Sequence, residues 1–155
     1  MGMRVRALVA EDRTAVAEAL VASAAFSADE VRVALEMADA GLAGDYLLPS
    51  IEAEGAVRAY ACIGHATLTA ASWYVYWFCV HPAWQGRGYG RALNAHIEEQ
   101  VSAAGGERLV VETSGRDDYA RARRFYERSV YALAGRIADF YKTGDDCLIY
   151  CKALR

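Results

Sequence analysis

Long apolar runs are missing from this chain of 155 residues. No stretch approaches the roughly 20 apolar residues that a helix needs to cross a bilayer. The opening residues, MGMRVRALVAEDR, also lack an apolar segment of signal-peptide length. We therefore expect no membrane partner and a cytoplasmic protein.

An excess of positive charge is also missing, because 17 Lys and Arg stand against 20 Asp and Glu, a net charge of -3. Nucleic-acid affinity depends on a surplus of Lys and Arg over the binding face, so this balance predicts no nucleic-acid partner. A content of 55% hydrophobic and 24% charged residues is ordinary for a globular protein. The length fits one domain, which we predict over residues 1–155.

Cysteine patterns typical of metal sites are absent. The 4 cysteines lie in strand-like apolar runs, without CxxC spacing or a nearby pair of histidines. This argues against a zinc site or a disulfide framework, so we expect no metal and interpret the cysteines as small core residues. The cysteines are Cys62, Cys79, Cys147 and Cys151, and the scattered histidines are His65, His81 and His96.

Repeats, linkers and low-complexity segments are absent, and apolar periodicity predicts the first elements. Residues 3–8 alternate as a strand, and 11–23 form a helix with Val16, Leu20 and Ser23 on one stripe. A second helix begins at Ser27, which forms a capping box with Glu30. Its expected buried face is Val31, Leu35 and Ala38, and its expected end is Gly41 or Gly44.

The rest of the chain alternates strands and helices. Strands are expected over 45–53, 56–64, 73–80, 108–113, 132–141 and 146–154, and helices over 88–104 and 117–129. Glu54–Ala56 reads as a hairpin turn, and the strand 73–80 is apolar on both faces and therefore central. The helix from residue 88 buries Leu93, Ile97 and Val101. This order predicts an α/β fold with a mixed sheet and a right-handed parallel crossover.

Three glycines mark the junction between the central strand and the next helix, in the stretch WFCVHPAWQGRGYGRAL. Glycine permits a turn with positive φ, and the unpaired N–H groups of a helix's first turn attract phosphate. Arg87 and Arg91 add positive charge beside Gly86, Gly88 and Gly90. The junction therefore predicts an anion site.

The spacing of these glycines separates the known phosphate loops. A P-loop needs GxxxxGK[ST], and a dinucleotide loop needs GxGxxG, whose third glycine would stand one residue later. The sequence Gln85-Gly86-Arg87-Gly88-Tyr89-Gly90 instead resembles the [Gln/Arg]-x-x-Gly-x-[Gly/Ala] loop of the GCN5-related N-acetyltransferases (GNAT). The flanking VHP and RAL and the order of elements are also similar to that family, so the resemblance covers nearly the whole chain.

The resemblance implies a mostly antiparallel mixed sheet, flanked by helices, with a central splayed parallel pair at 74–80 and 108–113. It also implies acetyl-coenzyme A (acetyl-CoA) as cosubstrate. The backbone of Phe78, Cys79 and Val80 would pair with the pantetheine arm. The pyrophosphate would be bound by Gln85, Gly86, Arg87, Gly88, Tyr89, Gly90 and Arg91.

The family's second motif falls in the helix YARARRFYERS. Ala122 and Tyr126 match it, and the resemblance assigns Tyr126 as the general acid that protonates the departing thiolate. The alternative for Tyr126 is a packed aromatic beside Phe125. Tyr119 stands at a coenzyme position where the family commonly has asparagine, a departure that bears on any side-chain bond to the pantetheine. Val130-Tyr131 replaces the usual Gly-Phe.

A general base is harder to assign, because WYVYWFCV lacks the glutamate that some members carry on this strand. Glu112, acting through a water molecule, is the first candidate, and Asp139 and Asp118 follow. Asp139, Asp145 and Asp146 would suit a cationic amine, or form a polar turn at TGDD. An arginine cluster, interpreted as a solvated helix face or a 3′-phosphate contact, comprises Arg116, Arg121, Arg123, Arg124 and Arg128.

Two functions of different class remain. The first is transfer of the acetyl group from acetyl-CoA to a primary amine of a small molecule or peptide, by direct attack in a ternary complex. The second is a non-catalytic acyl-CoA sensor or partner module on the same fold. Tyr126 favours the first, and the missing strand carboxylate favours the second. The acceptor and the oligomeric state, with a homodimer among the options, stay open.

Overall fold

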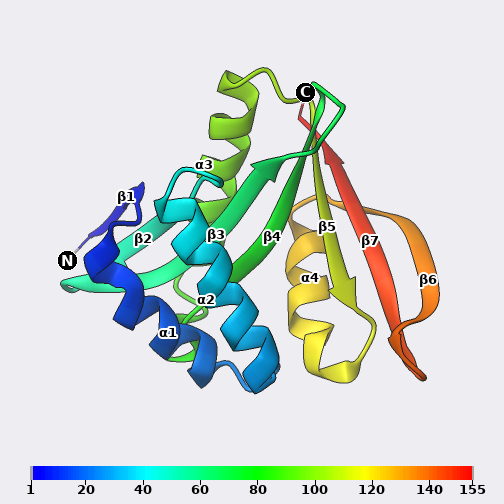
Figure 1. The fold of residues 1–155 in the computed structure, drawn as a ribbon, viewed down its shortest axis with the longest axis horizontal. Helices are drawn as coiled ribbons and strands as arrows, with labels where there is room; N and C mark the ends of the chain where they lie inside the picture. The colour runs from blue at the N-terminus through cyan, green and yellow to red at the C-terminus, as the bar shows by residue number, and fades with distance from the viewer. Residues whose placement is uncertain (1, 155) are drawn as a thin grey trace. The chain divides into compact units, whose positions relative to one another are not determined.

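The computed structural model describes residues 2–154. Within them, one seven-stranded sheet has the order β1-β2-β3-β4-β5-β7-β6 and is mostly antiparallel, with β4 and β5 parallel (Figure 1). The predicted order of elements is confirmed, with three short 3₁₀ helices added. The strands are β1 (Met3–Ala7), β2 (Pro49–Ala53), β3 (Ala56–His65), β4 (Ser72–Val80), β5 (Arg108–Ser114), β6 (Ala132–Lys142) and β7 (Asp145–Ala153). The helices are η1 (Ala10–Asp12), α1 (Arg13–Ala22), α2 (Ala28–Leu42), η2 (Pro82–Trp84), α3 (Tyr89–Ala103), η3 (Asp117–Tyr119) and α4 (Ala120–Arg128).

The chain divides into two compact units. The first unit comprises Met1–Gly64 and Tyr76–Gln100, and the second comprises His65–Val75 and Val101–Arg155. The strand β4 and the helix α3 each contribute residues to both. The single domain expected over residues 1–155 stays a prediction.

Local signals set the ends of α2 in the first unit. The Ser27 hydroxyl accepts from the Glu30 N–H and the Glu30 carboxylate accepts from the Ser27 N–H, each at 3.1 Å, which confirms the capping box. The helix continues through Gly41, where a Cβ would lie 2.7 Å from Leu48 Cδ1. It ends before Gly44, whose φ is +108°. Gly41 is therefore a packing glycine, and Gly44 is the correct one of the two expected ends.

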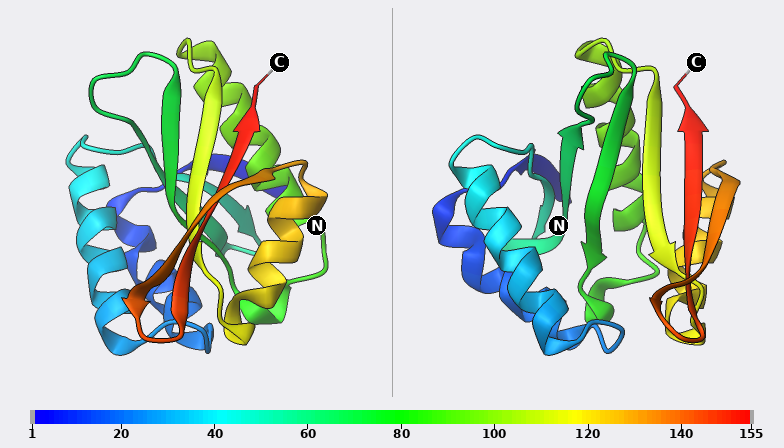
Figure 2. Two further views of the ribbon diagram at one scale, coloured as in Figure 1. Left: turned by 90° about the vertical axis from the view of Figure 1, so that its right-hand side faces the viewer. Right: turned by 45° about the vertical axis from the view of Figure 1, so that its right-hand side comes forward.

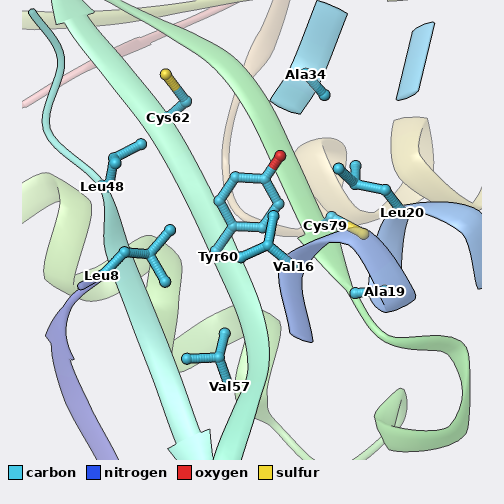
Figure 3. Packing of buried hydrophobic residues seen from close by; sticks show 10 residues of the cluster. All are labelled: Leu8, Val16, Ala19, Leu20, Ala34, Leu48, Val57, Tyr60, Cys62 and Cys79. Carbon is cyan, nitrogen blue, oxygen red and sulfur yellow. The ribbon is translucent and has the colours of Figure 1, made fainter. Parts of the chain in front are cut away.

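The core of the first unit lies between α1, α2 and the strands β3 and β4 (Figure 3). Val16 and Leu20 are buried as predicted, but Ser23 is not on the buried stripe, because it follows α1 with extended backbone. Tyr60 is 0% exposed, and its hydroxyl has no hydrogen-bond partner within residues 2–154. On α2, Ala34 and Ala38 are buried, while Val31 and Leu35 are only partly so.

An ionic network joins β1, η1 and β2. Arg6 donates through Nη1 and Nη2 to the Asp12 carboxylate at 2.7 and 2.9 Å, and through Nε to Glu52 at 2.7 Å. The Asp12 carboxylate also accepts from the Val9 N–H at 2.8 Å. The hydrogen bond from Arg6 is the main cause that lowers the pKa of Asp12. This network fixes the start of the chain to the sheet.

The second unit holds the parallel pair and the final hairpin. Ser72–Tyr74 pair in parallel with Arg108–Val110, and β5 then pairs antiparallel with β7. Figure 2 shows β6 lying along β7, and almost every residue of β6 is exposed because it is the last strand in the sheet order. Leu109 and Cys147 are fully buried.

The strand β4 is central in the sheet order, as predicted, although its two apolar faces are not both fully buried. Only Val75 and Cys79 are buried, and Tyr76 is 41% exposed. The side chains alternate, so Cys79 and Trp77 belong to the core beneath α1 and α2, while Tyr76 packs against Tyr46.

The cysteines are mostly core residues, as expected. All four are free; Cys62, Cys79 and Cys147 are buried, and Cys151 is partly buried. None of the helices formed by residues 2–154 is long and apolar enough to cross a membrane.

Candidate active site

The glycine loop between β4 and α3 belongs to the first unit. Gly86 has a φ of +77° and Gly88 a φ of +85°, and a Cβ added at either residue would meet no atom within 4 Å. Positive φ, rather than close packing, therefore accounts for glycine here. The space beside both residues is open, as a bound anion would require.

Hydrogen bonds within the loop fix its path. The His81 Nδ1 atom accepts from the Ala83 N–H at 3.1 Å, and the Trp84 N–H donates to the His81 carbonyl at 2.8 Å. The side-chain amide of Gln85 donates to the Val80 carbonyl at 3.3 Å. Gln85 thus closes the turn and is itself partly buried.

The first turn of α3 supplies the donors. The Ala92 N–H donates to the Gly88 carbonyl at 3.0 Å, which is the first helical bond. The N–H groups of Tyr89, Gly90 and Arg91 precede it and have no acceptor within the helix. The helix dipole adds partial positive charge at this end. These groups, with the open glycines, fit the pyrophosphate of acetyl-CoA.

The end of β4 offers backbone rather than reactive side chains. Cys79 is buried, and burial raises the pKa of its thiol to about 12. A thiol with such a pKa is protonated at neutral pH and is a poor nucleophile. Phe78 and Val80 on either side are partly buried. The strand thus holds Cys79 as a core residue, and the expected pairing of Phe78, Cys79 and Val80 with a pantetheine arm stays a prediction.

Tyr126 lies in an aromatic cluster of the second unit. It is 7% exposed, and its ring centroid is 5.6 Å from that of Phe125, 5.4 Å from Tyr131 and 6.2 Å from Tyr150. Burial raises the pKa of Tyr126 above its ordinary value. The hydroxyl is therefore protonated at neutral pH, as a general acid must be before it donates. The packing role weighed from the sequence is also present, because the ring is part of this cluster.

The turn after α4 directs Tyr131 onto Tyr126. The Val130 N–H donates to the Glu127 carbonyl at 3.1 Å and the Tyr131 N–H to the Tyr126 carbonyl at 3.0 Å, which is a Schellman motif. Its left-handed residue is Val130, with a φ of +69°, where the family usually has glycine. A β-branched residue is strained in this region. The motif holds the rings of Tyr126 and Tyr131 in edge contact despite that strain.

Tyr119 is the residue before α4, and its ring lies 5.4 Å from Arg116 Cζ. A phenol in this place cannot offer the carboxamide group that asparagine would provide. Its assignment to the coenzyme therefore depends on position alone and stays a prediction.

The candidate bases differ in how they are engaged. Glu112 is exposed on β5, with the Cys147 thiol 4.0 Å from its carboxylate, and within residues 2–154 it forms no ion pair. Asp118 lies 3.5 Å from Arg116, and Asp139 accepts from the Gly144 N–H at 2.8 Å. Of the three carboxylates, Glu112 therefore makes the weakest contact with another residue.

The aspartates of the last hairpin hold the hairpin together. Asp145 is buried, accepts from the Ser114 hydroxyl and lies 3.8 Å from Arg116. Asp146 accepts from the Asp139 N–H and from Arg136, and these two contacts lower its pKa in that order. These engagements favour the polar turn over a site for a cationic amine.

A pocket beside this hairpin has a volume of ≈ 200 Å³, below the roughly 300–1,000 Å³ that is usual for ligand sites. It is lined by Gly115, Arg136, Gly144, Asp146 and Leu148.

Within residues 2–154, no three His, Cys, Asp or Glu side chains are grouped so as to hold a metal ion.

The arginines near α4 separate into two groups. Arg121, Arg124 and Arg128 are exposed, as a solvated helix face should be. Arg123 instead donates to the carbonyls of Ser114 at 2.8 Å and Arg116 at 2.7 Å, so its interpretation as solvated is wrong. It ties the end of β5 to α4.

Sequence reasoning missed the environment of Trp84 in η2. Two guanidinium groups, those of Arg58 and Arg87, lie over its ring. The only available signal was an aromatic residue directly before the glycine loop, and nothing local connects it to residue 58.

Comparison with known proteins agrees with this fold and loop. The sequence profile of the Acetyltransferase (GNAT) family matches residues 13–130. A crystal structure of a GNAT-family protein from Desulfovibrio desulfuricans is 32% identical, with a TM-score of 0.94, over 99% of this chain and 100% of that one. A comparison with curated proteins finds no match.

Two more distant structures share the fold. The ribosomal-protein-S18-alanine N-acetyltransferase of Escherichia coli is 21% identical, with a TM-score of 0.80, over 99% of this chain and 94% of that one. A Salmonella typhimurium protein solved with acetyl-CoA is 20% identical, with a TM-score of 0.78, over 100% of this chain and 95% of that one. With a family profile that spans most of its length, the chain belongs to the acetyltransferase (GNAT) family.

Proposed function

We propose that this protein transfers the acetyl group of acetyl-CoA to a primary amine of a small molecule or peptide. The observation that carries the proposal is the loop at the start of α3, where Gly86 and Gly88 leave open space beside unpaired helix N–H groups. Acetyl-CoA supplies the activated thioester. The amides of residues 85–91 bind its pyrophosphate, and the backbone of residues 78–80 pairs with its pantetheine arm.

The amine attacks the thioester directly in a ternary complex. A C–N bond forms and the C–S bond breaks, while Glu112 takes a proton from the amine through water and Tyr126 gives one to the departing sulfur. The buried thiols argue against an acyl-enzyme, because burial raises the pKa of Cys62 and of Cys79 to about 12. Direct attack needs only those two proton transfers from the protein.

The test is release of free CoA thiol from acetyl-CoA over a panel of primary amines, including peptide N-termini. At least one amine should give turnover well above the hydrolysis of acetyl-CoA alone. Glu112→Gln should lower turnover, because it removes the carboxylate that is proposed to take the amine's proton. Turnover near the wild-type value in Glu112→Gln would assign the base elsewhere, with Asp139 next.

A second candidate is a non-catalytic acyl-CoA sensor or partner module. The observation in its favour is β4, Ser72–Val80, which carries no carboxylate. Tight binding of acetyl-CoA without turnover on any amine would favour it over the enzyme. The cytoplasmic location and the absence of a nucleic-acid partner stay predictions, and the oligomeric state stays open.

A further inference from the structure

Two positively charged side chains lie over the ring of Trp84, beside the glycine loop. The Arg58 Cζ atom lies 4.3 Å and the Arg87 Cζ atom 4.5 Å from the centroid of its ring, and the ring of Tyr89 stacks at 6.1 Å with an interplanar angle of 23°. All four residues belong to the first unit. The cluster therefore joins β3, η2, the glycine loop and the first residue of α3.

Arg58 is held in place from several directions. Its Nε atom donates to the carbonyl of Ala53, the last residue of β2, at 3.0 Å, and its Nη2 atom to the carbonyl of Glu54, in the turn that follows, at 3.3 Å. The His81 N–H donates to the Arg58 carbonyl at 2.8 Å. Arg58 thus links the β2–β3 turn to the residue that begins the loop, and its guanidinium has little freedom to leave Trp84.

The charges of this cluster point to an anion. The separation of the two Cζ atoms is at most the sum of their distances to the ring centroid, 4.3 and 4.5 Å. This upper bound is close to the ~8 Å Debye length at physiological salt. Their repulsion is therefore incompletely screened. The face of the indole offsets part of it, and a nearby dianion would offset more. Arg87 lies between Gly86 and Gly88, where the pyrophosphate is proposed to bind.

We propose that Trp84 and Arg58 are positioning residues for the pyrophosphate loop. Arg58 fixes the indole, and the indole fixes Arg87 and the approach of the loop to α3. Neither residue needs to touch the coenzyme. This inference rests on the proposed function and adds to it two residues outside the glycine motif. It predicts weaker coenzyme binding on their loss, with the chemical step unaffected.

The test measures the Kd of CoA by calorimetry for four variants and a double variant. Trp84→Leu should weaken binding about tenfold and Arg58→Met about fivefold, because each loses a partly desolvated cation–π contact. Trp84→Phe keeps an aromatic face and should stay within about threefold of wild type, while Arg58→Lys should fall between. The Kd of the double variant Arg58→Met, Trp84→Leu should exceed that of Trp84→Leu by no more than about twofold, since the two residues act as one unit.

Further measurements separate positioning from a general loss of structure. The KM for acetyl-CoA should rise in Trp84→Leu while kcat at saturation stays within about twofold. Dephospho-CoA, which lacks the 3′-phosphate, should show the same fold-losses as CoA. Arg4→Met, an exposed arginine on β1, is the control and should bind like wild type. If Trp84→Leu fails to fold, Arg58→Met compared with Arg58→Lys tests the same loss of binding.

Three results would overturn the inference while the proposed function stands. They are unchanged Kd in Trp84→Leu and Arg58→Met, strictly additive losses in the double variant, and losses that vanish with dephospho-CoA. Wild-type protein that binds neither CoA nor acetyl-CoA would overturn the proposed function, and this inference with it.

Discussion

The two units differ in which groups form the proposed site, backbone groups in the first and side chains in the second. In the first unit the proposed site is backbone: two glycines with positive φ, and the N–H groups at the start of α3. In the second unit it is side chain: the Tyr126 hydroxyl and the Glu112 carboxylate. A backbone site depends on local conformation, so a glycine pattern can indicate it. A side-chain site depends on neighbours distant in sequence, so a residue type alone says little.

Each unit also contains a buried tyrosine, and the residues that surround it differ. Tyr60 in the first unit lies among apolar residues, and its hydroxyl has no hydrogen-bond partner within residues 2–154 (Figure 3). Tyr126 in the second unit lies among other aromatic rings. Desolvation is the first cause that raises the pKa of each. Burial alone therefore does not distinguish a core tyrosine from a candidate acid, and experiment must.

The largest expected effect tests the backbone site. Gly88→Glu should weaken CoA binding at least about 100-fold, because it places an anion and a strained φ where the pyrophosphate is proposed to bind. Calorimetry on the folded variant measures this. Gly105→Glu is the matched control, since Gly105 has a φ of +86° against +85° for Gly88, and both face open space. Equal affinities for the two variants would remove the phosphate-loop assignment.

The next effect tests the side-chain site. Tyr126→Phe should leave folding and acetyl-CoA affinity near wild type and lower turnover about 10²- to 10⁴-fold, the usual contribution of a positioned proton donor. Steady-state kinetics with an accepted amine provides the measurement. Tyr60→Phe removes a buried hydroxyl from the first unit and should leave turnover unchanged. A loss of less than about threefold in Tyr126→Phe, with chemistry rate-limiting, would return Tyr126 to a packing role.

A smaller effect concerns the stability of the first unit. Asp12→Asn should lower the free energy of unfolding by about 2 kcal/mol at pH 7, because Arg6 loses a charge-assisted, bidentate partner. The pKa of Asp12 is lowered in the folded state, so its contribution is present above its unfolded pKa of about 3.9 and is lost as pH falls through the folded pKa.

Urea unfolding at several pH values measures that difference. The stabilities of wild type and Asp12→Asn should begin to converge as pH falls below about 4 and should meet below the folded pKa of Asp12. Asp39→Asn breaks the exposed pair with Arg13 and should cost much less. A difference between wild type and Asp12→Asn that stays constant down to pH 2 would show that the ionic network is not its source.

The smallest effect concerns strain in the second unit. Val130→Gly should stabilise the fold by about 0.5–1 kcal/mol, because relief of the left-handed strain exceeds the backbone entropy that glycine adds. Val130 is 75% exposed, so little buried area is lost. Val130→Ala keeps most of the strain and should unfold close to wild type in urea. Destabilisation by glycine would mean that the valine side chain has a packing role.

The sequence predicted the elements well because their signals are local. The capping box of Ser27 and Glu30 involves residues three apart, and Leu93, Ile97 and Val101 are all fully buried as their spacing indicates. Ser23 was misplaced because α1 ends one residue earlier, a boundary that periodicity does not define. The helix α2 runs through Gly41, and residue 41 is glycine because Leu48, in the segment just before β2, occupies the space of a Cβ.

What the sequence by itself determined is the order of elements, the glycine turn before α3 and membership of the family, because periodicity, capping and φ are properties of neighbouring residues. Only the tertiary structure decided which polar side chains are engaged. Asp145 bonds Ser114, 31 residues away, and Arg123 closes the end of β5. The indole of Trp84 meets Arg58 on β3. Such contacts form only when strands and turns bring residues that are distant in sequence close together in space. No local sequence pattern specifies which distant residues will meet.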